Sequence, residues 1–320
     1  MNIVVFDGYV NNPGDLSWDA LKQYGTVTVY DRTPRNELQE RARQADIAVS
    51  SKVFWDAEAL SWAPNLKMIA LTSTGYNVVD LDAARSHGVV VSNVPAYSTP
   101  DVAQMTFALL LELCLHVGYH SELVMDGAWV KSPDFSFWKT PLVEIAGKTL
   151  GIVGMGHIGQ AVCRIARAFG MDVVFENRSP KPDLEGEGVR QVNLDELLAS
   201  SDVVTLHVPA TPETSGMMDA GAIAKMKDGA ILLNTARGTL VDEQAVADAL
   251  HAGKLGGFGA DVVSVEPMKA DNPLLSCKGE NIVVTPHIAW ATHEARERLL
   301  ATVAANVGAF VDGRPQNVVD

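Results

Sequence analysis

The sequence has few cysteines, no long uninterrupted apolar run and no excess of basic residues. Its cysteines, Cys114, Cys163 and Cys277, are widely spaced and form no paired or metal-binding motif. An odd number of dispersed cysteines in a chain of this size is typical of reduced thiols. We therefore expect a cytoplasmic protein without disulfides, and we expect no metal site.

The charge balance excludes two classes of partner. The formal net charge is -14, and binding to nucleic acid or to an anionic membrane surface needs an excess of Lys and Arg on one face. The longest apolar stretch, residues 107–115, contains Glu112 and is too short to cross a bilayer. The N-terminal run at 2–6 lacks a basic start, and Asp7 ends it before it reaches the length of a signal peptide. We expect neither a nucleic-acid nor a membrane partner.

The first hundred residues alternate short β-rich runs with helical patterns. Helical patterns at 16–24, 37–45 and 82–87 lie between the runs. The predicted strands are residues 3–6, 27–30, 47–49, 68–71 and 89–92. This alternation predicts an α/β domain with a parallel sheet and helices on both faces. Two prolines in 93–100 then indicate a linker.

A long apolar helix is predicted over 101–125, followed by an irregular stretch at 127–141. This stretch carries four aromatic residues, Trp129, Phe135, Phe137 and Trp138. Aromatic side chains in a loop have two natural positions. They pack on the body of their own subunit, or they anchor a dimer interface.

The strand and helix alternation resumes near residue 150. Six predicted strands are residues 150–154, 173–176, 203–208, 230–234, 257–262 and 282–285. Six strands with helices between them fit a doubly wound dinucleotide-binding domain. A final helical pattern covers 292–311.

A glycine-rich loop follows the first of these strands. The strand at 150–154 runs directly into Gly-Met-Gly-His-Ile-Gly and then into an amphipathic helix at 160–169. Glycines at this junction allow a tight turn, a close approach of the backbone to a pyrophosphate and close packing of helix on strand. The candidate cofactor-binding residues of the loop are Gly154, Gly156, His157, Ile158 and Gly159.

The choice between NAD and NADP depends on the end of the next strand, where the sequence is Phe-Glu-Asn-Arg-Ser at 175–179. If Glu176 faces the ribose, its carboxylate favours NAD. If Asn177 faces it, that repulsion is absent and Arg178 can pair with a 2′-phosphate. Arg178 is equally compatible with a position in solvent.

Three short segments near the ends of late strands carry Arg, Glu and His. They are Asn-Thr-Ala-Arg-Gly at 234–238, Asp-Val-Val-Ser-Val-Glu-Pro at 261–267 and Thr-Pro-His-Ile-Ala-Trp at 285–290. Ligands bind at the carboxyl ends of strands in open α/β sheets. We therefore expect these side chains to converge on one site.

Along essentially its whole length the sequence resembles the D-isomer-specific 2-hydroxyacid dehydrogenases. Within that family it is most similar to glycerate dehydrogenases, also called hydroxypyruvate reductases, through the motifs at 31–34, 74–80, 132–135 and 286–290. The resemblance implies a Rossmann-type nucleotide domain, residues 100–287, inserted into a flavodoxin-like substrate domain formed by 1–99 and 288–320. It also implies an NAD- or NADP-dependent exchange of hydride between a small 2-keto acid and its D-2-hydroxy acid. We further expect a homodimer.

The resemblance also implies roles for individual residues. Arg237 would bind the substrate carboxylate, and His287 would be the general acid that Glu266 holds protonated by a hydrogen bond. Asp261 would orient the nicotinamide carboxamide. Thr235 and Ala236 would line the cofactor site together with Arg237 and His287, and Thr74, Gly75 and Tyr76 would hold the carboxylate through main-chain groups. Lys52 either adds positive charge there or is an ordinary exposed lysine.

Two departures from the family pattern bear on specificity. Many relatives have an acid where this chain has Asn177, so both NADP and NAD remain candidate cofactors. Many have Gly-Ser where this chain has Ala289-Trp290, so Trp290 is expected to shape the substrate pocket. The alternatives are a D-lactate, formate or phosphoglycerate type, the long form of which would carry a further domain, or a dinucleotide-sensing corepressor-like protein.

Overall fold

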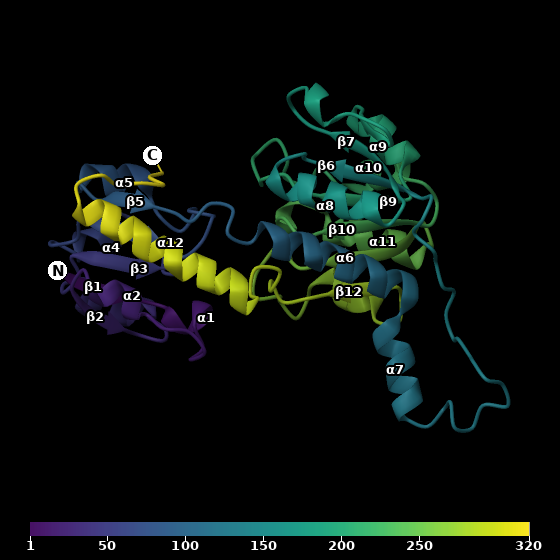
Figure 1. Ribbon diagram of the computed structural model, residues 1–320, viewed down its shortest axis with the longest axis horizontal. Coiled ribbons are helices and arrows are strands. Elements are labelled where there is room, and N and C mark those ends of the chain that lie inside the picture. The colour runs from purple at the N-terminus through teal and green to yellow at the C-terminus, as the bar shows by residue number, and fades with distance from the viewer. Residues whose placement is uncertain (320) are drawn as a thin grey trace. The chain divides into compact units, whose positions relative to one another are not determined.

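The computed structural model describes residues 1–319, which divide into two compact units (Figure 1). One unit combines Met1–Ser98 with the C-terminal segment that begins at Trp290. The other is Thr99–Ala289. The first unit is therefore discontinuous in sequence, and the second is inserted into it.

The first unit contains a five-stranded parallel sheet in the order β2-β1-β3-β4-β5. This order is that of flavodoxin-like domains. Its strands are β1 (Asn2–Val5), β2 (Thr26–Val29), β3 (Ile47–Ser50), β4 (Met68–Leu71) and β5 (Val90–Ser92). Its helices are α1 (Gly8–Asn11), α2 (Asp19–Lys22), α3 (Arg35–Ala42), α4 (Ala57–Ser61), α5 (Leu81–Ser86) and α12 (His293–Val311).

Alternating side chains of β1 divide the core of this unit into two layers. Ile3 and Val5 pack with Leu299 of α12, whereas Val4 and Phe6 belong to the cluster on the other face. Because successive residues of a strand point to opposite faces, the apolar run 3–6, which begins in β1, needs helices on both sides. The C-terminal helix α12 supplies one of these two layers (Figure 1).

The second unit contains a seven-stranded parallel sheet in the order β12-β11-β10-β9-β6-β7-β8. From β8 to β11 this is the strand order of Rossmann domains. The strands are β6 (Thr149–Val153), β7 (Asp172–Glu176), β8 (Val189–Gln191), β9 (Val203–Leu206), β10 (Ala230–Asn234), β11 (Leu255–Ala260) and β12 (Ile282–Val284). The helices are α6 (Thr99–Leu115), α7 (Val117–Met125), α8 (His157–Ala168), α9 (Leu194–Ser200), α10 (Ala220–Lys225) and α11 (Glu243–His251), with short 3-10 turns at Pro182–Leu184, Gly238–Leu240 and Pro273–Cys277.

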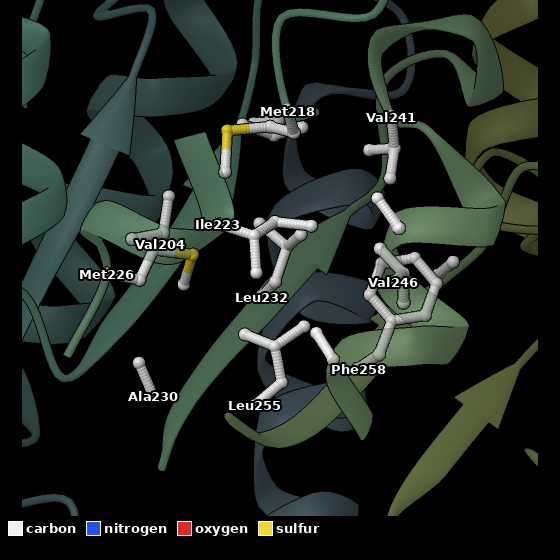
Figure 2. Close-up of a cluster of buried hydrophobic side chains, with 14 of the residues drawn as sticks. Val204, Met218, Ile223, Met226, Ala230, Leu232, Val241, Val246, Leu255 and Phe258 are labelled. Carbon is white, nitrogen blue, oxygen red and sulfur yellow. The ribbon is translucent and has the colours of Figure 1, made fainter. Parts of the chain in front are cut away.

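Two apolar clusters cover the two faces of this sheet. On one face, Leu232 and Phe258 from the strands gather with Ile223 and Val246 from α10 and α11 (Figure 2). On the other face, α6 and α8 bury side chains against β6 and β7. This packing fixes the position of the loops that follow β6, β10, β11 and β12.

Two of the sequence predictions for this region are wrong. The single helix expected over 101–125 is two helices, because His116 adopts a left-handed conformation with φ of +48° between α6 and α7. The six strands expected after residue 150 are seven, because β8 was missed at the sheet edge. Among residues 1–319 no single helix is long and apolar enough to cross a membrane, although α6 and α7, bent by 58°, meet that length and composition together.

The segment after α6 is strongly exposed within this unit. No residue of α7 is buried, and Phe135 in the following irregular stretch is 90% exposed. Trp129 and Trp138 are also exposed, whereas Phe137 is half-buried. Of the two positions open to these aromatic side chains, packing on their own subunit leaves Phe135 almost wholly in solvent.

Candidate functional site

The glycine loop joins β6 to α8 at the carboxyl end of the sheet's strands. Gly154 has a φ of +96°, and a Cβ there would lie 2.7 Å from the main-chain oxygen of His207. A Cβ on Gly159 would lie 2.2 Å from the oxygen of Gly154. Both positions therefore need glycine because of contacts within the chain, one for the turn and the other for the packing of helix on strand.

Gly156 is different and provides the test of whether the loop fits a dinucleotide. It is exposed, its φ is -78°, and a Cβ there would have no atom within 4 Å. No side chain caps the N-terminus of α8 either, so the first turn presents its N–H groups to solvent. Open space beside uncapped N–H groups at a helix N-terminus fits a pyrophosphate.

His207, which the sequence analysis did not select, lies beside this loop. It follows β9, and its main-chain N–H donates to the oxygen of Val153. Burial lowers the pKa of His207 to about 3, so the imidazole is neutral at physiological pH. Its Nε2 lies 3.0 Å from the hydroxyl of Thr205, and this hydrogen bond orients the ring.

The turn after β7 carries the residues that bear on cofactor choice. The main-chain N–H of Met155 donates to Oδ1 of Asn177 over 3.2 Å, and Nδ2 of Asn177 donates to the oxygen of Ser179 over 2.8 Å. Burial raises the pKa of the Glu176 carboxyl. Arg178 is exposed on the same turn. Asn177 thus joins this turn directly to the glycine loop.

The three segments with Arg, Glu and His follow three neighbouring strands. Asn234 of β10 is aligned with Ala260 of β11, and Ala260 is aligned with Val284 of β12. Because all three strands are parallel, the residues that follow them emerge at the same edge of the sheet. Arg237, Glu266 and His287 therefore belong to adjacent loops of one unit.

Glu266 and His287 are in direct contact. Nδ1 of His287 lies 2.6 Å from a carboxylate oxygen of Glu266, and both side chains are about one-third exposed. Glu243, at the start of α11, accepts hydrogen bonds from the N–H and hydroxyl of Ser264 and from the amide of Asn272. Glu243 thereby holds the loop that carries Glu266, a role for which the sequence offered no local signal.

The loop that carries Arg237 is closed by Asn234. The side chain of Asn234 donates to the oxygen of Arg237 over 2.8 Å and accepts the N–H of Ala236. The hydroxyls of Thr235 and Thr106 lie 3.1 Å apart. One Nη1 N–H of Arg237 donates to the oxygen of Ala236, and the exposed guanidinium keeps its other donors available.

Gly238 brings this loop against the loop after β11. A Cβ on Gly238 would lie 1.9 Å from the carbonyl carbon of Val263. Only glycine permits this approach, which places the main chain after Arg237 against the segment that leads to Glu266.

Asp261, predicted as a nicotinamide ligand, is almost fully buried and already holds three donors of its own chain. Its carboxylate accepts the hydroxyl of Thr285 and the N–H groups of Ile288 and Ala289. All three belong to the segment around His287. His287 itself has a φ of +56°, which is uncommon for a residue with a side chain.

The remaining predicted residues lie in the first unit, each in a loop at the carboxyl end of its sheet or at the start of its last helix. Thr74 is held by its hydroxyl, which donates to the oxygen of Val94, and Ser73 donates to the oxygen of Gly75. Among residues 1–319, the main-chain N–H groups at 74–76 have no acceptor. Tyr76 is exposed, and Trp290 is half-buried before α12.

Lys52 lies in a neighbouring loop of the first unit. The buried carboxylate of Asp7 accepts the N–H groups of Ser51, Lys52 and Val53, and burial raises the pKa of Asp7. Asp7 thereby fixes the main chain of this loop, and nothing in these contacts gives the Lys52 side chain a role.

The glycine loop, its uncapped helix and the strand order define the second unit as a dinucleotide-binding domain of the Rossmann type. The family model for the D-isomer specific 2-hydroxyacid dehydrogenase, NAD binding domain, matches residues 107–289. The chain belongs to this family, and its second unit is an NAD-binding domain.

Individual relatives agree with this membership over 89–100% of the chain. The chain is 48% identical over 323 residues to a hydroxypyruvate reductase of Blautia hydrogenotrophica, covering 100% of both proteins. It is 43% identical over 284 residues to a glycerate dehydrogenase of Methylorubrum extorquens, covering 89% of this chain and 88% of that protein. Among solved structures, an acyclic imino acid reductase in complex with NADPH and D-Arg has a TM-score of 0.84, with 32% identity and full coverage of both chains.

Proposed function

We propose that this enzyme reduces hydroxypyruvate or glyoxylate with NAD(P)H, giving D-glycerate or glycolate. The observation that carries the proposal is the 2.6 Å contact between Glu266 and His287 at the edge of an NAD-binding sheet. The names of the relatives from Blautia and Methylorubrum support the choice of substrate.

In this proposal the acid–base chemistry belongs to His287. Reduced nicotinamide, when bound, supplies the hydride that adds to the keto carbon. The imidazole of His287 donates a proton to the keto oxygen, so one hydride and one proton convert the ketone to an alcohol. Glu266 hydrogen-bonds Nδ1, which orients the ring and leaves Nε2 to face the substrate.

The substrate carboxylate needs donors, since the chain as a whole is strongly acidic. Arg237 supplies a planar guanidinium with most of its donors available. The unpartnered N–H groups of Thr74, Gly75 and Tyr76 supply main-chain donors of the kind that hold anions. Trp290 is the residue expected to limit the size of the substituent on the keto carbon of the substrate.

For the cofactor, we propose that the enzyme accepts NADPH as well as NADH. Asn177 offers no negative charge to a 2′-phosphate, and the exposed Arg178 can pair with one. Asn177→Asp keeps the acceptor for Met155 and adds a charge, so the KM for NADPH should rise while the KM for NADH changes little. Arg178→Ala should also raise the KM for NADPH. An unchanged ratio of the two KM values in both variants would show that this turn does not read the phosphate.

We also propose a homodimer in the cytoplasm. The unburied helix α7 and the exposed Phe135 and Trp138 leave apolar side chains in solvent that a second copy of this chain would cover. The three unpaired cysteines support a reducing compartment. Sedimentation should give twice the chain mass, and Phe135→Asp with Trp138→Asp should give the monomer.

A matrix of substrates and cofactors tests the function. NADH and NADPH are each paired with hydroxypyruvate, glyoxylate and pyruvate, and NAD+ and NADP+ are each paired with formate, which is assayed in the oxidative direction. We expect the highest kcat/KM with hydroxypyruvate or glyoxylate. A preference for pyruvate would indicate a D-lactate type. Tight binding of NADH without turnover of any substrate would contradict an enzyme and favour a dinucleotide-sensing binding protein.

A further inference from the structure

Asp261 lies at the junction of three strands. It directly follows β11, and its main-chain N–H donates to the oxygen of Asn234 at the end of β10 over 3.0 Å. The main-chain N–H of Thr285, after β12, donates to the oxygen of Ala260 over 2.9 Å. The main chain of Asp261 is therefore fixed to the sheet before its side chain makes any contact.

The carboxylate of Asp261 then binds the segment around His287 on both sides. The Thr285 hydroxyl donates to Oδ1 over 2.5 Å, and the N–H of Ile288 donates to the same oxygen over 2.9 Å. The N–H of Ala289 donates to Oδ2 over 2.7 Å. Because Asp261 is only 1% exposed, water cannot compete for these hydrogen bonds.

His287 lies between the anchored residues and has no anchor of this kind itself. Its φ of +56° is a conformation that a residue with a Cβ keeps only where its neighbours enforce it. Its N–H donates to the oxygen of Thr285, and its ring reaches Glu266. One buried carboxylate thus fixes Thr285 before this unusual conformation and Ile288 and Ala289 after it.

We propose that Asp261 is a positioning residue for His287, in addition to any contact with the cofactor. By holding Thr285, Ile288 and Ala289, it enforces the left-handed backbone at His287. This backbone places the imidazole within hydrogen-bond distance of Glu266. The role in proton transfer rests on the proposed function, whereas the role in placing the ring does not.

Two variants remove this anchor in different ways. Asp261→Asn keeps the shape, but whichever way the amide is turned, its NH2 group faces the N–H of Ile288 or of Ala289. Thr285→Val removes one hydroxyl that has no predicted contact with cofactor. Thr302→Val is the matched control, because it removes a hydroxyl that donates to the oxygen of Arg298 on α12 and not to Asp261.

Proton NMR of the cofactor-free protein reads the position of the ring without turnover. The parent should show a low-field Nδ1 proton from the bond between His287 and Glu266, assigned by its loss in His287→Ala. We expect this signal to disappear in Asp261→Asn and in Thr285→Val and to persist in Thr302→Val. Its persistence in Thr285→Val and in a folded Asp261→Asn would overturn the proposal. If Asp261→Asn does not fold, the Thr285→Val spectrum decides alone.

Kinetics separate the anchor from a contact with the nicotinamide carboxamide. The kcat should fall about a hundredfold in Asp261→Asn and about tenfold in Thr285→Val, because a small misplacement of a catalytic group costs this much. The same fold losses are expected with the reduced 3-acetylpyridine analogue, in which a methyl group replaces the carboxamide NH2. A loss seen only with the normal cofactor, with Thr285→Val fully active, would assign Asp261 to the carboxamide alone. An inactive parent with the NMR pattern intact would contradict only the proposed function.

Discussion

Gly156 separates cofactor binding from folding, because nothing in the chain requires a glycine there. Its φ of -78° suits alanine, and a Cβ would meet no atom within 4 Å. Alanine at this helix N-cap should lower the free energy of unfolding by about 1 kcal/mol or less. The added methyl group would, however, occupy the space through which a pyrophosphate reaches the N–H groups of α8. Losing one hydrogen bond to a charged group costs about 1.5–3 kcal/mol, which weakens binding roughly 10- to 150-fold.

The assay is a fluorescence titration with NADH, paired with calorimetric unfolding of the same samples. Gly156→Ala should unfold close to the parent and bind NADH poorly. Gly159→Ala should lose stability, because its Cβ would lie 2.2 Å from the oxygen of Gly154. Gly186→Ala is the control, since a Cβ there also has no atom within 4 Å and the residue lies outside the loop. NADH binding by Gly156→Ala at parental affinity would refute the assignment of the loop to the pyrophosphate.

Three further predictions follow from single contacts. Arg237→Lys should fold and lose roughly 10- to 150-fold in kcat/KM, because a lysine cannot give two parallel hydrogen bonds to a carboxylate. Near-normal steady-state rates would mean that other residues bind the substrate carboxylate. In Glu266→Gln, kcat for reduction should fall because the carboxylate that orients the His287 ring is lost, and an unchanged kcat would mean that Glu266 does not support the acid. Arg296 holds the pKa of Asp15 down to about 2 from its ordinary 3.8, so the pair stabilises the fold above about pH 4 and loses this effect as pH falls through 2. The difference in unfolding free energy between parent and Asp15→Asn, measured in urea, should shrink over that range.

The central strands of both sheets could be predicted because a buried parallel strand is a continuous apolar run. Thus β3, β4, β9 and β10 are buried at every position. The edge strand β8 is three residues long, with the sequence Val-Arg-Gln and no buried residue, so it gives no such signal. The break after α6 was missed for a similar reason, since His116 adopts its left-handed conformation without a glycine or proline to announce it.

The candidate site divides in the same way. Local motifs pointed to the glycine loop and to the Arg, Glu and His segments, since each follows a predicted strand. The supporting residues were missed because their partners are distant in sequence or are main-chain atoms. Glu243 binds Ser264 and Asn272, and Asn234 binds the main chain of its own loop. The hydrogen bond expected between Glu266 and His287 is present, while the catalytic roles stay proposals.

The discontinuity of the first unit has a consequence for biosynthesis. The face of its sheet that carries Ile3 and Val5 is covered by Leu299 and Val303 of α12, which leave the ribosome only after the whole of Thr99–Ala289. At about 5–20 residues per second, the N-terminal strands wait on the order of ten seconds or longer with an apolar layer unprotected. The inserted unit has its own two-sided core and can fold during that interval. We therefore expect the N-terminal unit to complete its core only after α12 has been made, although its strands are made first.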